Sequence, residues 1–361
     1  AMIILAVESS CDETAVALVR DGRTVLADCI ASSVEMHRIY GGVVPEIASR
    51  KHIEVIAQLA DQALEQAGLS RGDIDAVAVT YAPGLIGAVL VGVSFAKSVA
   101  YALGVPLIPV HHVRGHIAAN YLAHPDLEPP FVCLCVSGGT SLLVDVKGYT
   151  EMEILGATRD DAAGECFDKI ARVMGLGYPG GAPLDRAAQG GNDKAFSLPR
   201  VHIQDAPLDM SFSGLKTAML NLIHNAQQKG EELPVADLAA SFSAAVSEEL
   251  VPRTMAAAQA KGYGKVAVVG GVAANSRIRR DLEQACQAAG CTLYLPPLKL
   301  CGDNGSMIGS QGYYEYLAGI RAGTDLNAYA NREIYRPYGT GTAPVFPSPV
   351  EKSVESVHNS L

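Results

Sequence analysis

The sequence lacks the features of several common protein classes. It contains no tryptophan and no Cys-x-x-Cys pair among its 8 cysteines, and its 38 acidic residues outnumber its 28 basic residues. The resulting net charge is −10. A protein that binds nucleic acid over a whole face usually carries a net positive charge. Any RNA contact is therefore expected at a local patch or with a partner. No Gly-X-Y period or proline-rich run covers the body of the chain, which excludes collagen-like and linker-like structures.

Membrane and secretion signals are also missing. No run of about 18 apolar residues is free of charge or of helix-breaking residues, so we expect no transmembrane helix. The first residues lead directly into a strand pattern without a basic leader. Cysteines within apolar runs, as in residues 131–136, are typical of reduced, buried thiols. These features predict a cytoplasmic protein.

One pattern of apolar and polar residues occurs twice. Residues 3–7 form an apolar run that predicts a buried strand, followed by a polar turn at 8–14 and a second apolar run at 15–19. Residues 131–136, 137–141 and 142–146 repeat this order. The chain of 361 residues is long enough for about two domains. The repetition therefore indicates two related lobes, each opening with a hairpin whose turn faces a shared cleft.

The remaining chain alternates between strand and helix patterns, which favours parallel or mixed sheets covered by helices. The predicted strands lie at 74–80, 105–110 and 265–269, and the predicted helices at 46–67, 87–103, 235–261, 277–289 and 307–317.

Two histidines have the spacing of metal ligands. If residues 112–116 are helical, His112 and His116 lie one turn apart on the same face. The segment lacks the glutamate of a His-Glu-x-x-His motif, so the general base of a zinc protease is missing. The alternative is a pair of partly buried histidines at a helix start. A metal site needs a third ligand, and Asp303 either supplies it or caps the helix that begins near Ser306.

Glycine-rich turns follow several predicted strands, as at 137–139, 180–181 and 270–271. Glycines there let backbone N–H groups approach a phosphate. None of these turns matches a P-loop or a Rossmann motif, but together, on two lobes, they favour a nucleotide-binding cleft. Carboxylates near such turns, among them Asp12, Glu13, Asp168 and Asp185, are either candidate general bases or solvated surface charges.

Five motifs in order resemble one protein family. The chain is similar to the TsaD family, the bacterial tRNA threonylcarbamoyladenosine transferases once labelled O-sialoglycoprotein endopeptidases. The resemblance covers residues 2 to about 336. The motifs are residues 8–14 (ESSCDET), 40–46 (YGGVVPE), 111–116 (HHVRGH), 212–216 (FSGLK) and 270–275 (GGVAAN).

The resemblance implies an α/β fold with two lobes of the actin, Hsp70 and sugar-kinase type, that is, duplicated mixed-sheet lobes around a central cleft. Residues 2–130 would form the N-terminal lobe, with a last helical segment near 305–336 packing back on it. Residues 131–304 would form the C-terminal lobe. Residues 337–361, rich in proline, glycine and serine, would be a flexible tail.

The resemblance also implies the reaction. A threonylcarbamoyl group would pass from threonylcarbamoyl-AMP to N6 of the adenosine beside the anticodon, in tRNAs that read ANN codons. His112, His116 and Asp303 would hold one divalent metal, Fe²⁺ or Zn²⁺, and Asp12 or Glu13 would accept a proton. The adenylate would be held by nine residues: Cys135, Val136, Ser137, Gly138, Gly139, Asp168, Gly181, Asp185 and Asn275.

Partners follow from the same resemblance: tRNA, an inactive paralogous subunit similar to TsaB, and a small P-loop ATPase similar to TsaE, with no membrane. The chain departs from the family at Thr140, where the family usually has histidine. Other interpretations are an ATPase or sugar-kinase-type phosphotransferase of the same superfamily, a peptidase, and a structural partner without activity. A metal site formed by His112, His116 and Asp303 would favour the transferase over the phosphotransferase.

Overall fold

The protein consists of two compact α/β units. A computed structural model describes residues 1–335 and 338. Among the described residues, 1–37, 43–126 and 303–335 belong to unit 1, and 38–42 and 127–302 form unit 2. Each unit is built on a five-stranded sheet. The tail predicted for 337–361 lies outside the described residues except for Tyr338.

The two sheets have the same topology. In unit 1 the strand order is β3-β2-β1-β4-β5, with β1, β2 and β3 antiparallel and β1, β4 and β5 parallel. In unit 2 the order is β8-β7-β6-β9-β10 with the same directions. The duplicated hairpin expected from the sequence is therefore confirmed as β1–β2 and β6–β7.

The elements of unit 1 are β1 (Ile3–Glu8), β2 (Glu13–Arg20), β3 (Thr24–Ser32), α1 (Val34–His37), α2 (Pro45–Ala67), η2 (Arg71–Asp73), β4 (Ala76–Ala82), α3 (Ile86–Leu103), β5 (Leu107–His111), α4 (His112–Ala123) and α10 (Gly305–Leu317). Those of unit 2 are η1 (Arg38–Tyr40), β6 (Phe131–Val136), β7 (Ser141–Val146), β8 (Met152–Ala157), α5 (Ala163–Val173), α6 (Gly181–Ala187), α7 (Ser213–Lys229), α8 (Val235–Lys261), β9 (Lys265–Val269), η3 (Gly271–Ala274), α9 (Ser276–Ala289), β10 (Thr292–Tyr294) and η4 (Leu298–Leu300).

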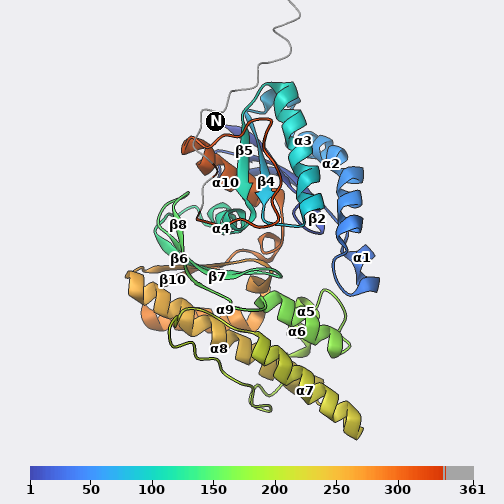
Figure 1. The fold of residues 1–361 in the computed structure, drawn as a ribbon. Helices are drawn as coiled ribbons and strands as arrows, with labels where there is room; N and C mark the ends of the chain where they lie inside the picture. Colours follow the sequence, from blue (N-terminus) through green and yellow to red (C-terminus); the bar gives the residue numbers. More distant parts are fainter. Residues whose placement is uncertain (336–337, 339–361) are drawn as a thin grey trace, which may run out of the picture. The chain divides into compact units, whose positions relative to one another are not determined.

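Helices cover both faces of the sheet in unit 1 (Figure 1). Alternate strand residues point to opposite faces, and the large ones, such as Leu5 and Val7, pack against α2 and α3. Small residues such as Ala6 and Ala17 face α10, where Gly305 and Gly309 approach the strands so closely that an added Cβ would lie under 3 Å from a strand atom. Burial on both faces explains why these strands appear in the sequence as unbroken apolar runs.

Helix α3 is long and strongly apolar. Ile86–Leu103 has a mean hydropathy of 1.7 over 18 residues, so by length and composition alone it is apolar enough to cross a membrane. A single helix of this kind does not contradict the expectation of no transmembrane helix, because packed core helices pass the same test. About a third of this helix is buried. Its buried face consists of small residues and valines, and Gly92 lies against Ser9 and Val7 of the β1 end. In unit 1 this helix packs on α2 and β4.

Helix α10 returns to unit 1 and ends at Leu317, well before the limit of 336 expected for the last helical segment. Gly319, with φ of 84°, stops the helix because only glycine adopts this backbone conformation without strain. The following residues cross the ends of the strands: Ala322 bonds to Leu107, and Tyr329 bonds to Tyr81. They bind back to α4 through Arg114, which donates to the Ile334 carbonyl.

In unit 2, helices α5, α7, α8 and α9 share one core with β6 and β9. Phe167 of α5 and Phe242 of α8 meet edge to face at its centre, with ring centroids 5.2 Å apart. All eight cysteines, each within the described residues, are free thiols, and six of them are buried. This agrees with the expectation of reduced cysteines.

We expect unit 1 to lose stability on mild acidification. Burial lowers the pKa of His52 on α2 and outweighs the opposing effects of the Cys11 carbonyl and of the charges of Glu8 and Asp12. The unfolded chain therefore binds a proton near its ordinary pKa of about 6.5, where the folded chain does not. Stability must fall as the pH drops below that value, by up to about 1.4 kcal/mol per pH unit.

Urea unfolding at a series of pH values across this range measures the slope. The His52→Gln variant cannot take up this proton, so its stability should depend less on pH by that amount. Equal slopes for the two proteins would contradict the assignment.

Candidate functional site

Helix α4 starts directly where β5 ends and brings two histidines onto one face. The His111 side chain caps the helix by accepting a hydrogen bond from the Val113 N–H at 3.2 Å. His112 and His116 are both helical, as their spacing required. Most of the helix is buried, with Gly115 so close to Ile308 of α10 that a Cβ there would lie 2.5 Å away. The histidines therefore sit on a firmly packed helix.

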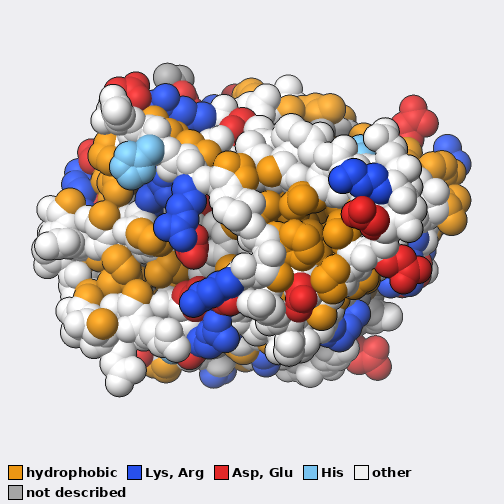
Figure 2. All heavy atoms as spheres, turned by 90° about the horizontal axis from the view of Figure 1, so that it is seen from below, with side chains coloured by type: hydrophobic (Ala, Val, Ile, Leu, Met, Phe, Trp, Pro, Cys, Tyr) orange, Lys and Arg blue, Asp and Glu red, His pale blue; other side chains and the backbone are white. Residues whose placement is uncertain are grey.

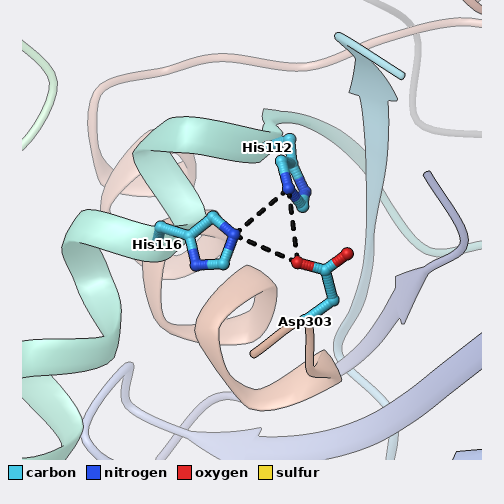
Figure 3. Close-up of side chains that lie close together, drawn as sticks. All are labelled: His112, His116 and Asp303. Carbon is cyan, nitrogen blue, oxygen red and sulfur yellow. Dashed lines mark hydrogen bonds and ion pairs between the residues drawn. The ribbon is translucent and has the colours of Figure 1, made fainter. Parts of the chain in front are cut away.

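His112, His116 and Asp303 form a triangle of potential ligand atoms (Figure 3). The Nε2 atoms of the two histidines are 3.2 Å apart, and Asp303 Oδ1 lies 3.4 Å from His112 Nε2 and 3.1 Å from His116 Nε2. Figure 3 shows the rings projecting from α4 toward the carboxylate, which precedes α10. Two imidazoles and one carboxylate on one side of a site can hold a divalent metal with open positions opposite.

Asp303 is not the cap of α10. The Asn304 side chain occupies that role and accepts from the Met307 N–H at 2.8 Å. Asp28 of β3 accepts from the N–H groups of Gly305 and Ser306, so the first turn of the helix is satisfied without Asp303. The alternative interpretation of Asp303 as a helix cap is therefore wrong, and its carboxylate is available to a ligand.

Glu8 is a functional residue that the sequence analysis did not single out. It is fully buried at the end of β1, and its Oε2 lies 3.0 Å from His112 Nδ1. Thr80 of β4 donates to the same oxygen, and the Ser10 N–H donates to the other at 2.6 Å. A carboxylate on the far nitrogen of a histidine fixes the ring and its tautomer, which leaves Nε2 free for a metal. The signals in the sequence were its place directly after an apolar run and at the start of the 8–14 motif.

The electrostatics of this cluster favour a positive charge. Burial alone would lower the pKa of His112, but the carboxylates of Glu8 and Asp303 outweigh it and raise that pKa to about 9. The pKa of Asp303 is lowered to about 2, since the attraction of His112 and the hydrogen bond to His116 overcome burial. The negative charge that stabilises a proton here also stabilises a metal cation, so the donor set fits a divalent ion.

We expect Glu8→Gln to weaken metal binding by about 10- to 100-fold, because the amide cannot hold His112 as the carboxylate does. Isothermal titration of the metal-free protein with Zn²⁺ measures the change directly. Glu35→Gln, on the short helix α1, removes one negative charge from the same unit and serves as the control. Unchanged affinity in Glu8→Gln would show that the Glu8 contact does not orient the ligand.

Asp12 and Glu13 lie close to this triangle. One carboxylate oxygen from each of Asp12, Glu13 and Asp303 falls within 4.8 Å of the others. Burial, followed by the hydrogen bond and charge of Asp12, raises the pKa of Glu13 to about 9. The polar turn after β1 thus brings the two predicted proton acceptors to the predicted metal ligands.

The nine residues predicted to hold the adenylate all belong to unit 2. Cys135 and Val136 end β6, and the turn at 137–139 is closed by a bond from the Ser137 N–H to the Thr140 carbonyl at 2.8 Å. An added Cβ at Gly138 or Gly139 would meet nothing within 4 Å, so the space around this turn is open.

The other predicted adenylate residues also have structural contacts. Asp168 of α5 accepts from the Gly180 N–H at 2.8 Å, directly before Gly181 begins α6. Asp185 of α6 accepts from the N–H and hydroxyl of Ser276. Asn275 caps α9 by accepting from the Ile278 N–H at 3.0 Å. These bonds tie α5, α6 and α9 together around the glycine turns.

The topology of the two sheets places the protein in a known class of α/β folds. Two sheets with one duplicated strand order belong to the actin, Hsp70 and sugar-kinase class of α/β proteins, here with a His/His/Asp cluster. The structure is similar to HypF from T. kodakarensis, with a TM-score of 0.59 and 16% identity, covering 88% of this chain and 48% of that one. Full-length HypF in a phosphate- and nucleotide-bound form gives a TM-score of 0.58 at 15% identity, covering 88% and 46%. At this identity the likeness concerns the fold alone.

The sequence identifies the particular family. A sequence model described as TsaD, tRNA N6-adenosine threonylcarbamoyltransferase, matches residues 24–310. Proteins of that name from Clostridium botulinum (strain 657 / Type Ba4) and Moorella thermoacetica are 52% and 55% identical to this chain. The matches cover 92% and 90% of this chain and 97% and 95% of the relatives. The chain belongs to the TsaD family of tRNA-modifying transferases, as its motifs indicated.

Proposed function

We propose that this transferase moves a threonylcarbamoyl group from threonylcarbamoyl-AMP to N6 of the adenosine beside the anticodon, in tRNAs that read ANN codons. The observation that carries the proposal is the convergence of His112, His116 and Asp303 within hydrogen-bond distance of one another. Family membership supplies the class of reaction. The cluster supplies a place to orient the donor.

His112, His116 and Asp303 would hold one divalent metal. Two nitrogens and one oxygen suit Fe²⁺, and Zn²⁺ accepts the same set. A bound metal polarises a carbonyl oxygen and fixes the donor in one orientation. Glu8 holds the His112 ring in place from its far nitrogen.

Asp12 or Glu13 would take the proton that the reaction releases. The exocyclic amine forms a bond to the carbamoyl carbon, the bond from that carbon to the phosphate oxygen breaks, and AMP leaves with the electron pair. The amine then loses one proton to a carboxylate. Both candidates lie beside Asp303, where the donor would be held. Because the pKa of Glu13 is raised to about 9, Glu13 keeps its own proton at neutral pH and can accept another only after passing that one on. Their role is positioning and proton transfer.

The AMP portion would bind to unit 2. Open space around Gly138 and Gly139 gives a phosphate access to backbone N–H groups. A cavity of about 500 Å³ adjoins Asp185, and its lining includes Gln189, Ser243 and Ser276. The Ser243 hydroxyl is buried with no hydrogen-bond partner in the described part of the chain. Such a group is suited to a polar ligand atom.

A transfer assay on the purified protein, with the TsaB-like and TsaE-like proteins added, tests the function. Wild type, Asp12→Asn and Glu13→Gln are incubated with threonylcarbamoyl-AMP and an ANN-reading tRNA, and both modified adenosine and released AMP are measured. We expect the wild-type protein to give equal amounts of modified adenosine and AMP. The variant that lacks the proton acceptor should lose about 100-fold or more in the rate of transfer. Full activity in both variants would show that neither Asp12 nor Glu13 accepts the proton. Phosphate transfer to an acceptor without AMP release would support the phosphotransferase interpretation instead.

The isolated chain should bind tRNA weakly and lose that binding steeply with salt. Its net charge is −10, and on the face drawn in Figure 2 Lys and Arg side chains are interspersed with Asp and Glu side chains. The net negative charge keeps the affinity low, and what binding there is comes from Lys and Arg contacts to phosphates, which salt weakens because each neutralised phosphate releases counterions. Filter binding across a series of salt concentrations measures this, and tight, salt-insensitive binding by the chain alone would contradict it. We expect a TsaB-like paralogue and a TsaE-like ATPase to complete the tRNA surface, which the same measurement with these proteins tests.

A further inference from the structure

The turn that carries Asp12 and Glu13 is held by hydrogen bonds from three separate elements. Three consecutive carbonyl groups of this turn each accept at least one hydrogen bond. The Leu85 N–H, ahead of α3, donates to the Ser10 carbonyl at 2.9 Å, and the His52 Nε2 on α2 lies 2.8 Å from the Cys11 carbonyl. Ser33, after β3, donates to the Asp12 carbonyl from its N–H at 2.9 Å and from its hydroxyl at 2.8 Å.

His52 is fully buried, and both of its ring nitrogens are used. Because a carbonyl can only accept, the contact to Cys11 assigns the proton to Nε2. Nδ1 then accepts from the Thr14 hydroxyl at 2.6 Å. The imidazole therefore joins the residues on either side of Asp12 and Glu13 and fixes the spacing between them.

His37 supports the same turn from the other side. It is fully buried, and its Nδ1 accepts from the Val44 N–H at 3.1 Å. Its Nε2 therefore carries the proton and donates to the Ser33 hydroxyl at 2.9 Å, and this hydroxyl donates to the Asp12 carbonyl. Through this chain the 40–46 motif, to which no role has been given so far, reaches the backbone of Asp12.

We propose that His52 and His37 are positioning residues for the transfer reaction, which fix the turn at 10–14 so that the Asp12 and Glu13 carboxylates remain beside Asp303. Burying two imidazoles without cost requires partners for all four nitrogens, whereas an apolar side chain of similar size needs none. Here the partners on the turn side are the Cys11 carbonyl, the Thr14 hydroxyl and, through Ser33, the Asp12 carbonyl. The two buried imidazoles therefore hold the backbone that carries the Asp12 and Glu13 carboxylates.

The proposal rests on the proposed function only for its kinetic consequence, so two measurements are made on each variant. His52→Leu fills the space without hydrogen bonds, and His52→Gln keeps a donor that can reach the Cys11 carbonyl. His224→Leu, an exposed histidine on α7, is the control. Hydrogen–deuterium exchange of the amides of residues 10–14 reports how firmly the turn is held, independently of activity. Kinetics of threonylcarbamoyl transfer and metal content report its consequence.

We expect His52→Leu to exchange faster at residues 10–14, to bind metal in the same stoichiometry, and to lose about 100-fold in kcat with a much smaller change in KM, because a displaced acceptor slows the chemical step rather than binding. His52→Gln should recover most of the lost kcat. A merely structural histidine would lower thermal stability and leave kcat of the folded protein unchanged, and that result would overturn the proposal, as would unaltered exchange.

Two smaller changes guard against a variant that does not fold. Ser33→Ala removes only the hydroxyl link from His37, since the Ser33 N–H still reaches the Asp12 carbonyl, and Thr14→Val removes only the bond to His52 Nδ1. Each should give a smaller loss in kcat of the same kind, and wild-type kcat in both would contradict the proposal. Absence of transfer in the wild-type protein assayed with the TsaB-like and TsaE-like proteins would instead contradict the proposed function, while the exchange measurement would still test the turn.

Discussion

His116→Ala should remove the metal from the protein and abolish transfer. His116 supplies one of three ligand atoms, and its Nε2 lies 3.2 Å from His112 Nε2 and 3.1 Å from Asp303 Oδ1. The two remaining ligands leave the ion mostly hydrated. Loss of an outer contact alone typically costs 10- to 100-fold in metal affinity, so we expect loss of a direct ligand to cost about 100-fold or more. Elemental analysis beside the transfer assay measures both effects.

The matched control is His124→Ala at the end of the same helix, which should retain metal and activity. Asp303→Ala should behave as His116→Ala does, without the loss of helix stability expected for a cap, because Asn304 caps α10. Wild-type metal content in both ligand variants would show that the cluster is not a metal site. Loss of metal with full transfer would separate the metal from the reaction.

Gly164→Ala should weaken donor binding while leaving metal binding intact. Gly164 lies in the first turn of α5, and its N–H donates to the Ser137 carbonyl at 3.2 Å. A Cβ at this position would lie 2.5 Å from the Ser137 oxygen and 2.7 Å from the Gly138 nitrogen. Both are backbone atoms of the turn proposed to hold the phosphate, so the methyl group must displace the turn itself. Overpacking of this kind costs about 1–3 kcal/mol.

When this free energy is needed to restore the turn for donor binding, KM for the donor rises by about tenfold or more, since about 1.4 kcal/mol corresponds to a factor of ten. Gly264→Ala, in the same unit, places its methyl group where no atom lies within 4 Å and should leave donor binding unchanged. Metal content should not change in either variant, because the metal ligands belong to unit 1. An unaltered KM in Gly164→Ala would show that the 137–139 turn does not contact the donor.

Much of the fold could be predicted because its signals are local. The β1–β2 and β6–β7 hairpins followed from apolar runs interrupted by polar turns, and α8 and β9 have the predicted bounds, Val235–Lys261 and Lys265–Val269. β3 and β8, one edge strand of each sheet, were not predicted, because their residues alternate between buried and exposed in an irregular way. Both are recognised only through their pairing with β2 and β7.

For the site, too, local features could be predicted from the sequence and long-range contacts could not. The sequence by itself determined that His112 and His116 share a helix face, because a spacing of four residues fixes neighbours on any α-helix. It also determined the family, through motifs that remain recognisable one by one.

Only the tertiary structure decided what Asp303 does, since the choice between helix cap and ligand depended on Asn304 and on Asp28 from a distant strand. It likewise revealed Glu8 behind His112, and His52 beneath the turn of Asp12. Contacts between residues far apart in the chain are set by the packing of helices on a sheet, and no local pattern in the sequence records them.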